Sequence, residues 1–179
     1  MKELELKFLE VDREDLVKRL IGAGAVLKVD DILKTVYFDT PDQKIMRSGD
    51  LLRVRTFGEK IELCWKDNMR LEDGCKVYDE TEVHVSDFEN TVKILQSLGY
   101  VQAIYFEKKR TEYILADGSK FEIDELPGVP VFVEIEAENA ARISELAREF
   151  NLEKYETSHL TGEELIKQKY GIELNGLKF

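Results

Sequence analysis

Charged residues two positions apart recur along this chain, and this spacing constrains its fold more than any other feature. The first segment, MKELELK, alternates Glu3, Glu5 and Lys7 with Leu4 and Leu6. Because neighbouring side chains of a β-strand point to opposite faces, such a segment has one apolar and one ionic face. The segment therefore predicts a two-faced strand with both signs of charge on the same side.

The same spacing occurs in five further strand-like segments. The basic doublets are Arg53 with Arg55 and Lys108 with Arg110, and the acidic doublets are Glu80 with Glu82, Glu122 with Asp124, and Glu134 with Glu136. One interpretation is a half-buried sheet whose charged face is solvated. Solvated faces usually mix uncharged polar residues with charges, whereas these doublets are sorted by sign. We therefore favour a single continuous ionic surface.

Four amphipathic segments predict helices, at residues 11–24, 86–99, 138–151 and 161–171. Asp12 is expected to cap the first, and Ser86 with Glu89 and Thr161 with Glu164 have the spacing of capping boxes. The predicted strands are approximately residues 2–9, 32–39, 50–57, 60–67, 76–85, 103–116, 119–125 and 130–137. Long runs of strands with few helical crossovers predict an antiparallel α+β fold, and we expect residues 1–179 to form a single domain.

If the sheet closes into a barrel, the charged face lies either inside or outside. Amphipathic helices need an apolar surface to pack on, which favours charges inside and leucines and valines outside. Buried charges are costly unless they are compensated, so this interior is expected to bind an ionic ligand. A polyanion with a divalent cation fits, because Arg and Lys bind phosphate oxygens and carboxylates bind Mg²⁺ or Mn²⁺.

The formal net charge of −11 argues against several partners. An acidic protein is a poor candidate for non-specific binding to nucleic acid or to anionic membranes. Apolar runs fall well short of the roughly 18 residues of a membrane span, and charges interrupt the N-terminus, so we expect a cytoplasmic protein. The two cysteines, Cys64 and Cys75, and the two histidines, His84 and His159, lack the spacing of a zinc site.

The charged segments, taken in order, resemble those of a known family. The segment ELELK at 3–7 matches the ExExK signature of the CYTH, or triphosphate tunnel metalloenzyme, superfamily. Further matching blocks are YFDT at 37–40, LLRVR at 51–55, WK at 65–66, ETE at 80–82, EKKR at 107–110, EID at 122–124 and VEIE at 133–136. The resemblance spans almost the whole chain. It implies an eight-stranded antiparallel closed β-barrel, or tunnel, with a charged interior and flanking amphipathic helices.

The resemblance also implies roles for single residues. The implied triphosphate ligands are Lys7, Arg53, Arg55, Lys66, Lys108 and Arg110. The implied ligands of Mg²⁺ or Mn²⁺ are Glu3, Glu5, Glu134 and Glu136, with Asp124 and Glu82 as further candidates. An alternative role for Glu3 and Glu80 is to orient basic neighbours. Where relatives often carry Ser-Tyr, this chain has Ser158 and His159, a departure that bears on substrate orientation.

Three functions stay open at the level of sequence. A class IV adenylyl cyclase, which the layout resembles most, converts ATP to cyclic AMP and pyrophosphate by attack of the 3′-hydroxyl on the α-phosphorus. A triphosphatase instead uses water to attack the terminal phosphorus of inorganic triphosphate, thiamine triphosphate or a nucleotide. The third alternative is a module that binds a nucleotide or polyphosphate without turnover. The chain is expected to be a monomer or a homodimer.

Overall fold

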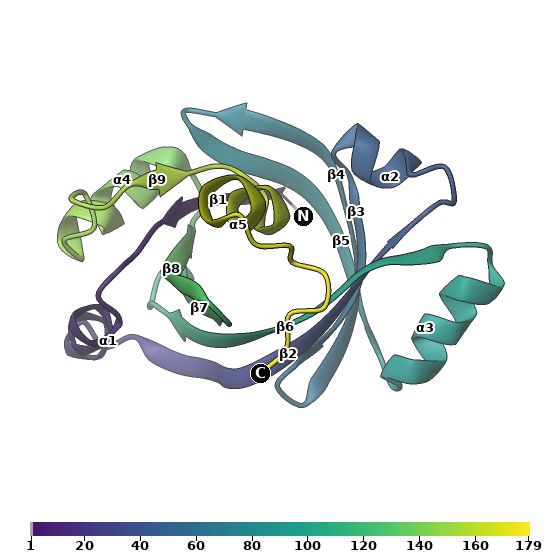
Figure 1. Ribbon diagram of the computed structural model, residues 1–179. Coiled ribbons are helices and arrows are strands. Elements are labelled where there is room, and N and C mark those ends of the chain that lie inside the picture. Colours follow the sequence, from purple (N-terminus) through teal and green to yellow (C-terminus); the bar gives the residue numbers. More distant parts are fainter. Residues whose placement is uncertain (1) are drawn as a thin grey trace.

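The computed structural model describes residues 2–179 (Figure 1). The strands are β1 (Lys2–Phe8), β2 (Val26–Asp39), β3 (Leu51–Phe57), β4 (Lys60–Glu72), β5 (Cys75–Val85), β6 (Val101–Ile114), β7 (Lys120–Leu126), β8 (Val129–Glu136) and β9 (Thr157–Ser158). The helices are α1 (Arg13–Gly22), α2 (Lys44–Ser48), α3 (Phe88–Ser97), α4 (Ala140–Glu149) and α5 (Gly162–Tyr170). Within the described range, every helix is too short or too polar to cross a lipid bilayer.

Strands β1 to β8 form a closed antiparallel barrel. The order around the sheet is β5-β4-β3-β2-β6-β7-β8-β1, and the pairing of β1 with β5 closes the ring. The short strand β9 adds to the end of β1, where Lys7 is opposite Ser158. Closure removes the exposed sheet edges that would otherwise present unpaired backbone groups. The predicted α+β class and the predicted eight-stranded tunnel are both confirmed.

Apolar side chains cover the outside of the barrel and pack against helices. On one side, Leu4 and Phe8 of β1 belong to a core cluster with Leu16 of α1 and Ile143 of α4. Figure 1 shows α1 and α4 on that side of the ring and α3 on the far side. The prediction that Leu4 faces outward under a helix is therefore confirmed, and the inner face of β1 is left to charged residues.

A second apolar cluster lies under α2 and α3, where Val36 of β2 and Val54 of β3 pack with Leu95. A third lies at one end of the barrel, where Ile166 of α5 and Leu174 of the C-terminal segment join Phe106 and Phe132. In Figure 1, α5 and the yellow C-terminal segment pass across the ring. The amphipathic helices thus account for the outer surface, and the last of them also closes part of one end.

The ends of several elements differ from the sequence prediction. Strand β2 begins at Val26 rather than at residue 32, because the long strand β6 offers it a pairing partner over that stretch. Helix α3 is capped by Asp87, whose side chain accepts a hydrogen bond from the backbone of Asn90, so the predicted cap at Ser86 is wrong. The short helix α2 was not predicted at all.

Two predicted caps are confirmed. Asp12 accepts a hydrogen bond from the backbone N–H of Asp15 at the start of α1. Thr161 and Glu164 form a reciprocal capping box at the start of α5. Both caps satisfy backbone donors that the first turn of a helix leaves without a partner.

A buried carboxylate holds α2 in place. Asp39, at the end of β2, is 0% exposed and accepts hydrogen bonds from the backbone N–H groups of Thr40 (2.7 Å), Ile45 (2.9 Å) and Met46 (3.2 Å). A helix this short is not stable on its own, so the charged acceptor fixes its position. Because Met46 also lines the barrel cavity, Asp39 shapes the cavity mouth without touching its interior.

Asp39→Ala should lower the free energy of unfolding by about 2–3 kcal/mol, since three buried backbone donors lose a charged acceptor. Urea denaturation followed by circular dichroism measures this. The matched control is Asp42→Ala in the same loop, whose carboxylate is half exposed, and it should leave the midpoint unchanged. Equal midpoints for both variants would show that Asp39 does not hold α2.

Candidate active site

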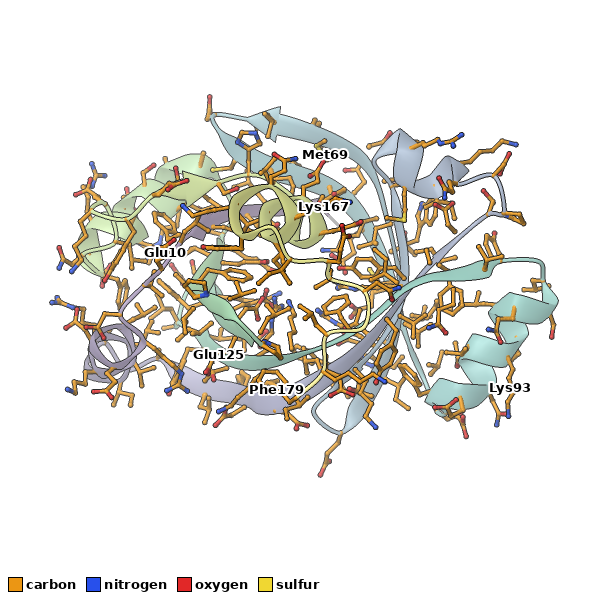
Figure 2. The ribbon with its side chains drawn as sticks, in the orientation of Figure 1. Glu10, Met69, Lys93, Glu125, Lys167 and Phe179 are labelled. Carbon is orange, nitrogen blue, oxygen red and sulfur yellow. The ribbon has the colours of Figure 1, made fainter. Side chains whose placement is uncertain are left out.

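The barrel encloses a cavity of about 1120 Å³ whose walls carry most of the charge doublets. In Figure 2 side chains project from the strands into the ring as well as away from it, whereas Lys93 of α3 lies on the outside. All six cations expected to bind triphosphate line the cavity, and they come from four strands. They are Lys7 of β1, Arg53 and Arg55 of β3, Lys66 of β4, and Lys108 and Arg110 of β6.

The strand register explains this convergence. Residues two apart on one strand share its inner face, and directly paired residues of neighbouring strands share a face as well. Thus Arg55 is opposite Glu62, Lys66 is opposite Glu80, and both pairs form salt bridges, at 2.5 Å and 3.2 Å. The doublets therefore meet because closure of the barrel places several alternating strands around one space.

Asp124 fixes two of the cations. Its carboxylate, which is 0% exposed, accepts from Lys108 Nζ at 2.7 Å and from Arg110 Nε and Nη2 at 2.7 and 2.6 Å. Burial alone would raise the pKa of Asp124, but Arg110 and Lys108 lower it to about 2. Asp124 thus acts on the two cations directly in this structure, although the sequence had suggested it as a metal ligand.

Glu122, two residues earlier on β7, has the opposite shift. It is buried beside Arg110, with which it forms a salt bridge, and its strand neighbour on β8 is Glu134. Burial, reinforced by the nearby charges of Glu134 and Asp124, raises the pKa of Glu122 to about 7. The interior therefore contains more carboxylate than the adjacent cations neutralise at this point.

The carboxylates expected to bind metal lie on β1 and β8, next to ammonium groups. Glu5 is buried, and its Oε1 is 2.8 Å from Lys7 Nζ and 2.5 Å from Lys76 Nζ. Burial alone would raise the pKa of Glu5, but Lys7 and Lys76 hold it well below its ordinary value. Lys7 Nζ is also 3.3 Å from Glu134, so one ammonium group contacts two candidate ligands.

A divalent cation fits this corner of the cavity. Glu5 and Glu136 are directly opposite in the β1–β8 pairing. Glu134 precedes Glu136 by two residues, so its side chain lies on the same inner face of β8. All three offer carboxylate oxygens, which suit Mg²⁺ or Mn²⁺. Each already contacts an ammonium group, which compensates its negative charge; Lys7 contacts Glu5 and Glu134, and Lys120 is 2.6 Å from Glu136.

Two further expected metal ligands, Glu3 and Glu82, come from β1 and β5. The backbone of Glu3 pairs with Tyr78, but its side chain lies outside the described part of the structure. Glu82 is on the β4–β5 wall, where one of its oxygens lies within 4.8 Å of ligand atoms of Glu62 and His84. Glu82 is exposed at the surface of this wall, and partial burial of its carboxylate together with the nearby charge of Glu62 raises its pKa.

Sequence reasoning missed several charged residues of the cavity, namely Glu62, Lys76, Glu112 and Lys120. Lys76 shares its face of β5 with Tyr78, Glu80 and Glu82, so extending the alternation backwards from the acidic doublet would have found it. His159, at the position where the family resemblance led us to expect tyrosine, is exposed, and the adjacent Ser158 accepts a hydrogen bond from the backbone of Leu160.

Part of the cavity wall is apolar. Tyr37 and Phe106 meet edge to face, with ring centroids 5.3 Å apart, and Phe132 and Ile166 line the same space. Met46, Leu51 and Met69 add apolar surface near α2. The cavity therefore joins a strongly charged region to a region that suits an uncharged, planar or aliphatic group.

The opposite pKa shifts of Glu122 and Asp124 predict opposite effects of amide substitution. Above its unfolded pKa, Asp124 stabilises the fold, so Asp124→Asn should destabilise the protein at both pH 8 and pH 5. Glu122 binds its proton more tightly when folded, so its contribution to stability falls as the pH rises from about 4.5 to 7. Glu122→Gln should therefore gain about 1–3 kcal/mol at pH 8 and little at pH 5.

Urea denaturation of both variants and the wild type, with EDTA present, measures these differences. The two substitutions are matched, because each replaces a buried carboxylate of β7 by its amide. Destabilisation of the same size at pH 8 in both variants would contradict the assignment of Glu122 as the excess acid.

Comparison with known proteins agrees with this geometry. Adenylate cyclase CyaB from Aeromonas hydrophila is 27% identical over 136 residues, covering 74% of this chain and 67% of CyaB. The structure of PH1012 from Pyrococcus horikoshii aligns with a TM-score of 0.71 and 26% identity, over 86% of this chain and 94% of that one. HpAC1 from Hippeastrum, for which a dominant triphosphatase activity is described, has the same fold, with a TM-score of 0.67 and 17% identity over 93% of this chain and 95% of its own.

The family model of the CYTH domain matches residues 1–170, which is nearly the whole chain. This match agrees with the closed barrel and with the ordered charge doublets on its inner face. The chain belongs to the CYTH domain family.

Proposed function

We propose that this protein is a metal-dependent enzyme that acts on a triphosphate inside the barrel, in the manner of a class IV adenylyl cyclase. One observation carries the proposal: six basic side chains from four strands face the same cavity as the acids of β1 and β8. A triphosphate carries about four negative charges, so several cations around it would stabilise its binding. On a solvated sheet face, such cations would not need to converge on one space.

The cations would bind and orient the phosphates. Arg53 and Arg110 offer planar guanidinium groups that suit two oxygens of one phosphate, and Lys66 and Lys108 offer point charges. Asp124 keeps Lys108 and Arg110 in position before substrate arrives, so little reorganisation is needed. In a buried site these charges interact more strongly with the developing charge on a leaving pyrophosphate than they would in water.

Glu5, Glu134 and Glu136 would hold the divalent cation, which supplies activation of the attacking hydroxyl and neutralisation of phosphate charge. In the cyclase reaction the 3′-oxygen of ATP forms a bond to the α-phosphorus. The bond from that phosphorus to the bridging oxygen breaks, and pyrophosphate leaves. The protein contributes mainly position and electrostatics, as in other phosphoryl transfers.

The apolar wall favours a nucleotide over inorganic triphosphate. Inorganic triphosphate has no group to place against Tyr37, Met46 and Leu51, which line the cavity and are only partly buried, whereas an adenine ring suits aromatic and aliphatic neighbours. The similarity to CyaB, a cyclase by name, supports the same choice.

Triphosphatase activity is the second candidate. The charged residues serve the triphosphate itself, so the same ligands would support attack by water on the terminal phosphorus. The open question between the two activities is which phosphorus the cavity presents to the nucleophile, and product analysis answers it directly.

Incubation of the purified protein with Mg²⁺ or Mn²⁺ and ATP should yield cyclic AMP and pyrophosphate in equal amounts. Thiamine triphosphate and inorganic triphosphate, offered separately, should yield little orthophosphate, and EDTA should abolish every product. Orthophosphate from all three substrates without cyclic AMP would establish the triphosphatase instead. Binding of the substrates with no product would leave only a binding module.

Adjacent lysines of β6 allow a matched test of the cavity. Lys108→Ala should lower turnover by about 10²–10³-fold, because it removes a cation from the proposed phosphate site. Lys109 projects from the other face of β6, where its Nζ is 3.6 Å from Asp30, and Lys109→Ala should retain wild-type turnover. Initial rates, with circular dichroism to verify folding, make the comparison. Full turnover in the Lys108 variant would be incompatible with a triphosphate site at this wall.

A further inference from the structure

Lys76, a residue outside the sequence motifs, contacts Glu5, the carboxylate at the centre of the proposed metal site. Lys76 of β5 is directly opposite Glu5 of β1, and its Nζ is 2.5 Å from Glu5 Oε1. Lys7 contacts the same oxygen from its own strand, at 2.8 Å. Glu5 is therefore held between two lysines, both of which line the cavity.

Lys76 is placed differently from Lys7. Lys7 lies between Glu5 and Glu134, and these two carboxylates raise its pKa despite its burial. Lys76 is 5% exposed, and burial lowers its pKa although Glu5 opposes the shift. Among the described residues Lys76 forms a salt bridge with Glu5 alone, whereas Lys7 forms one with Glu5 and one with Glu134, so a second anionic partner would stabilise the ammonium group of Lys76.

Lys76 and one of the proposed phosphate ligands lie beside the same aromatic ring. Its Nζ is 5.3 Å from the centroid of the Tyr78 ring, and Nζ of Lys66 is 5.7 Å from the centroid of the same ring. Lys66 is one of the cations assigned to the triphosphate. Both ammonium groups therefore lie beside one aromatic ring, and a chain of three phosphates bound at Lys66 is long enough to extend along this wall towards Lys76.

We propose that Lys76 is a positioning residue that makes metal binding at Glu5 depend on the triphosphate. Without substrate, its ammonium neutralises Glu5 and opposes a divalent cation at that carboxylate. When the triphosphate enters, its oxygens give Lys76 another partner, and Glu5 becomes available to the metal. This inference rests on the proposed function and adds to it an order of binding in which the anion promotes the cation.

Two binding measurements test the proposal without turnover. The first is Mn²⁺ binding to the protein without any phosphate, followed by the electron paramagnetic resonance signal of free Mn²⁺. Lys76→Met should bind Mn²⁺ at least about tenfold more tightly than the wild type, because a positive charge next to the metal is removed. Lys76→Arg, which keeps the charge, should resemble the wild type.

The second measurement is calorimetric titration with inorganic triphosphate in EDTA. Here Lys76→Met should bind about tenfold more weakly, because it lacks a cation. Lys66→Met is the matched control, since it also removes an ammonium group beside Tyr78. Lys66 contacts Glu80 instead of Glu5. It should weaken triphosphate binding but tighten Mn²⁺ binding clearly less than Lys76→Met does, because Lys66 acts on Glu5 more weakly than Lys76, which contacts it.

The two proposals fail in different ways. If the wild type binds both Mn²⁺ and triphosphate but Lys76→Met does not tighten Mn²⁺ binding, the role of Lys76 is refuted and the proposed function stands. Equal tightening in Lys66→Met would also refute it, because general charge removal would then explain the effect. A wild type that binds neither ligand would overturn the proposed function and this inference together.

Discussion

Charge compensation inside a closed barrel is the constraint on which the rest of this structure depends. Carboxylates and cations share one buried space, and an uncompensated charge there would be strongly destabilising. The strand register supplies the compensation, because it sets Arg55 against Glu62 and Lys66 against Glu80 on neighbouring strands. The interior is therefore a network of ion pairs whose members also line the cavity.

The apolar residues make that interior possible. Every strand that places a charge inside places an apolar residue outside, and the outer surface must then be covered. Helices α1 and α4 cover one side, α2 and α3 cover another, and α5 with the C-terminal segment covers one end. The helices thus contribute to function indirectly, since they stabilise a barrel whose charged face points inward.

Two carboxylates that lie two residues apart on β7 are held in different ways by the network. Asp124 is fully engaged by Lys108 and Arg110, so those cations are held before any substrate binds. Glu122 is buried with its pKa raised to about 7, so a nearby positive charge would favour its ionised form. Asp124 therefore orders the two cations that we propose bind phosphate, whereas the raised pKa of Glu122 indicates that this part of the interior is rich in negative charge.

The sequence by itself determined the class of fold, most strand positions and the face on which each doublet lies, because a period of two is a local property of a strand. It also predicted the six cations that now line the cavity. It did not locate α2, because a helix of five residues carries little periodic signal and depends on the buried side chain of Asp39 at the end of β2. Nor could it identify Lys76 as the partner of Glu5, since β1 and β5 meet only when the barrel closes. The spacing of charges along each strand is a local property of the sequence. Which charges meet depends on strand register and barrel closure, and both arise from tertiary pairing.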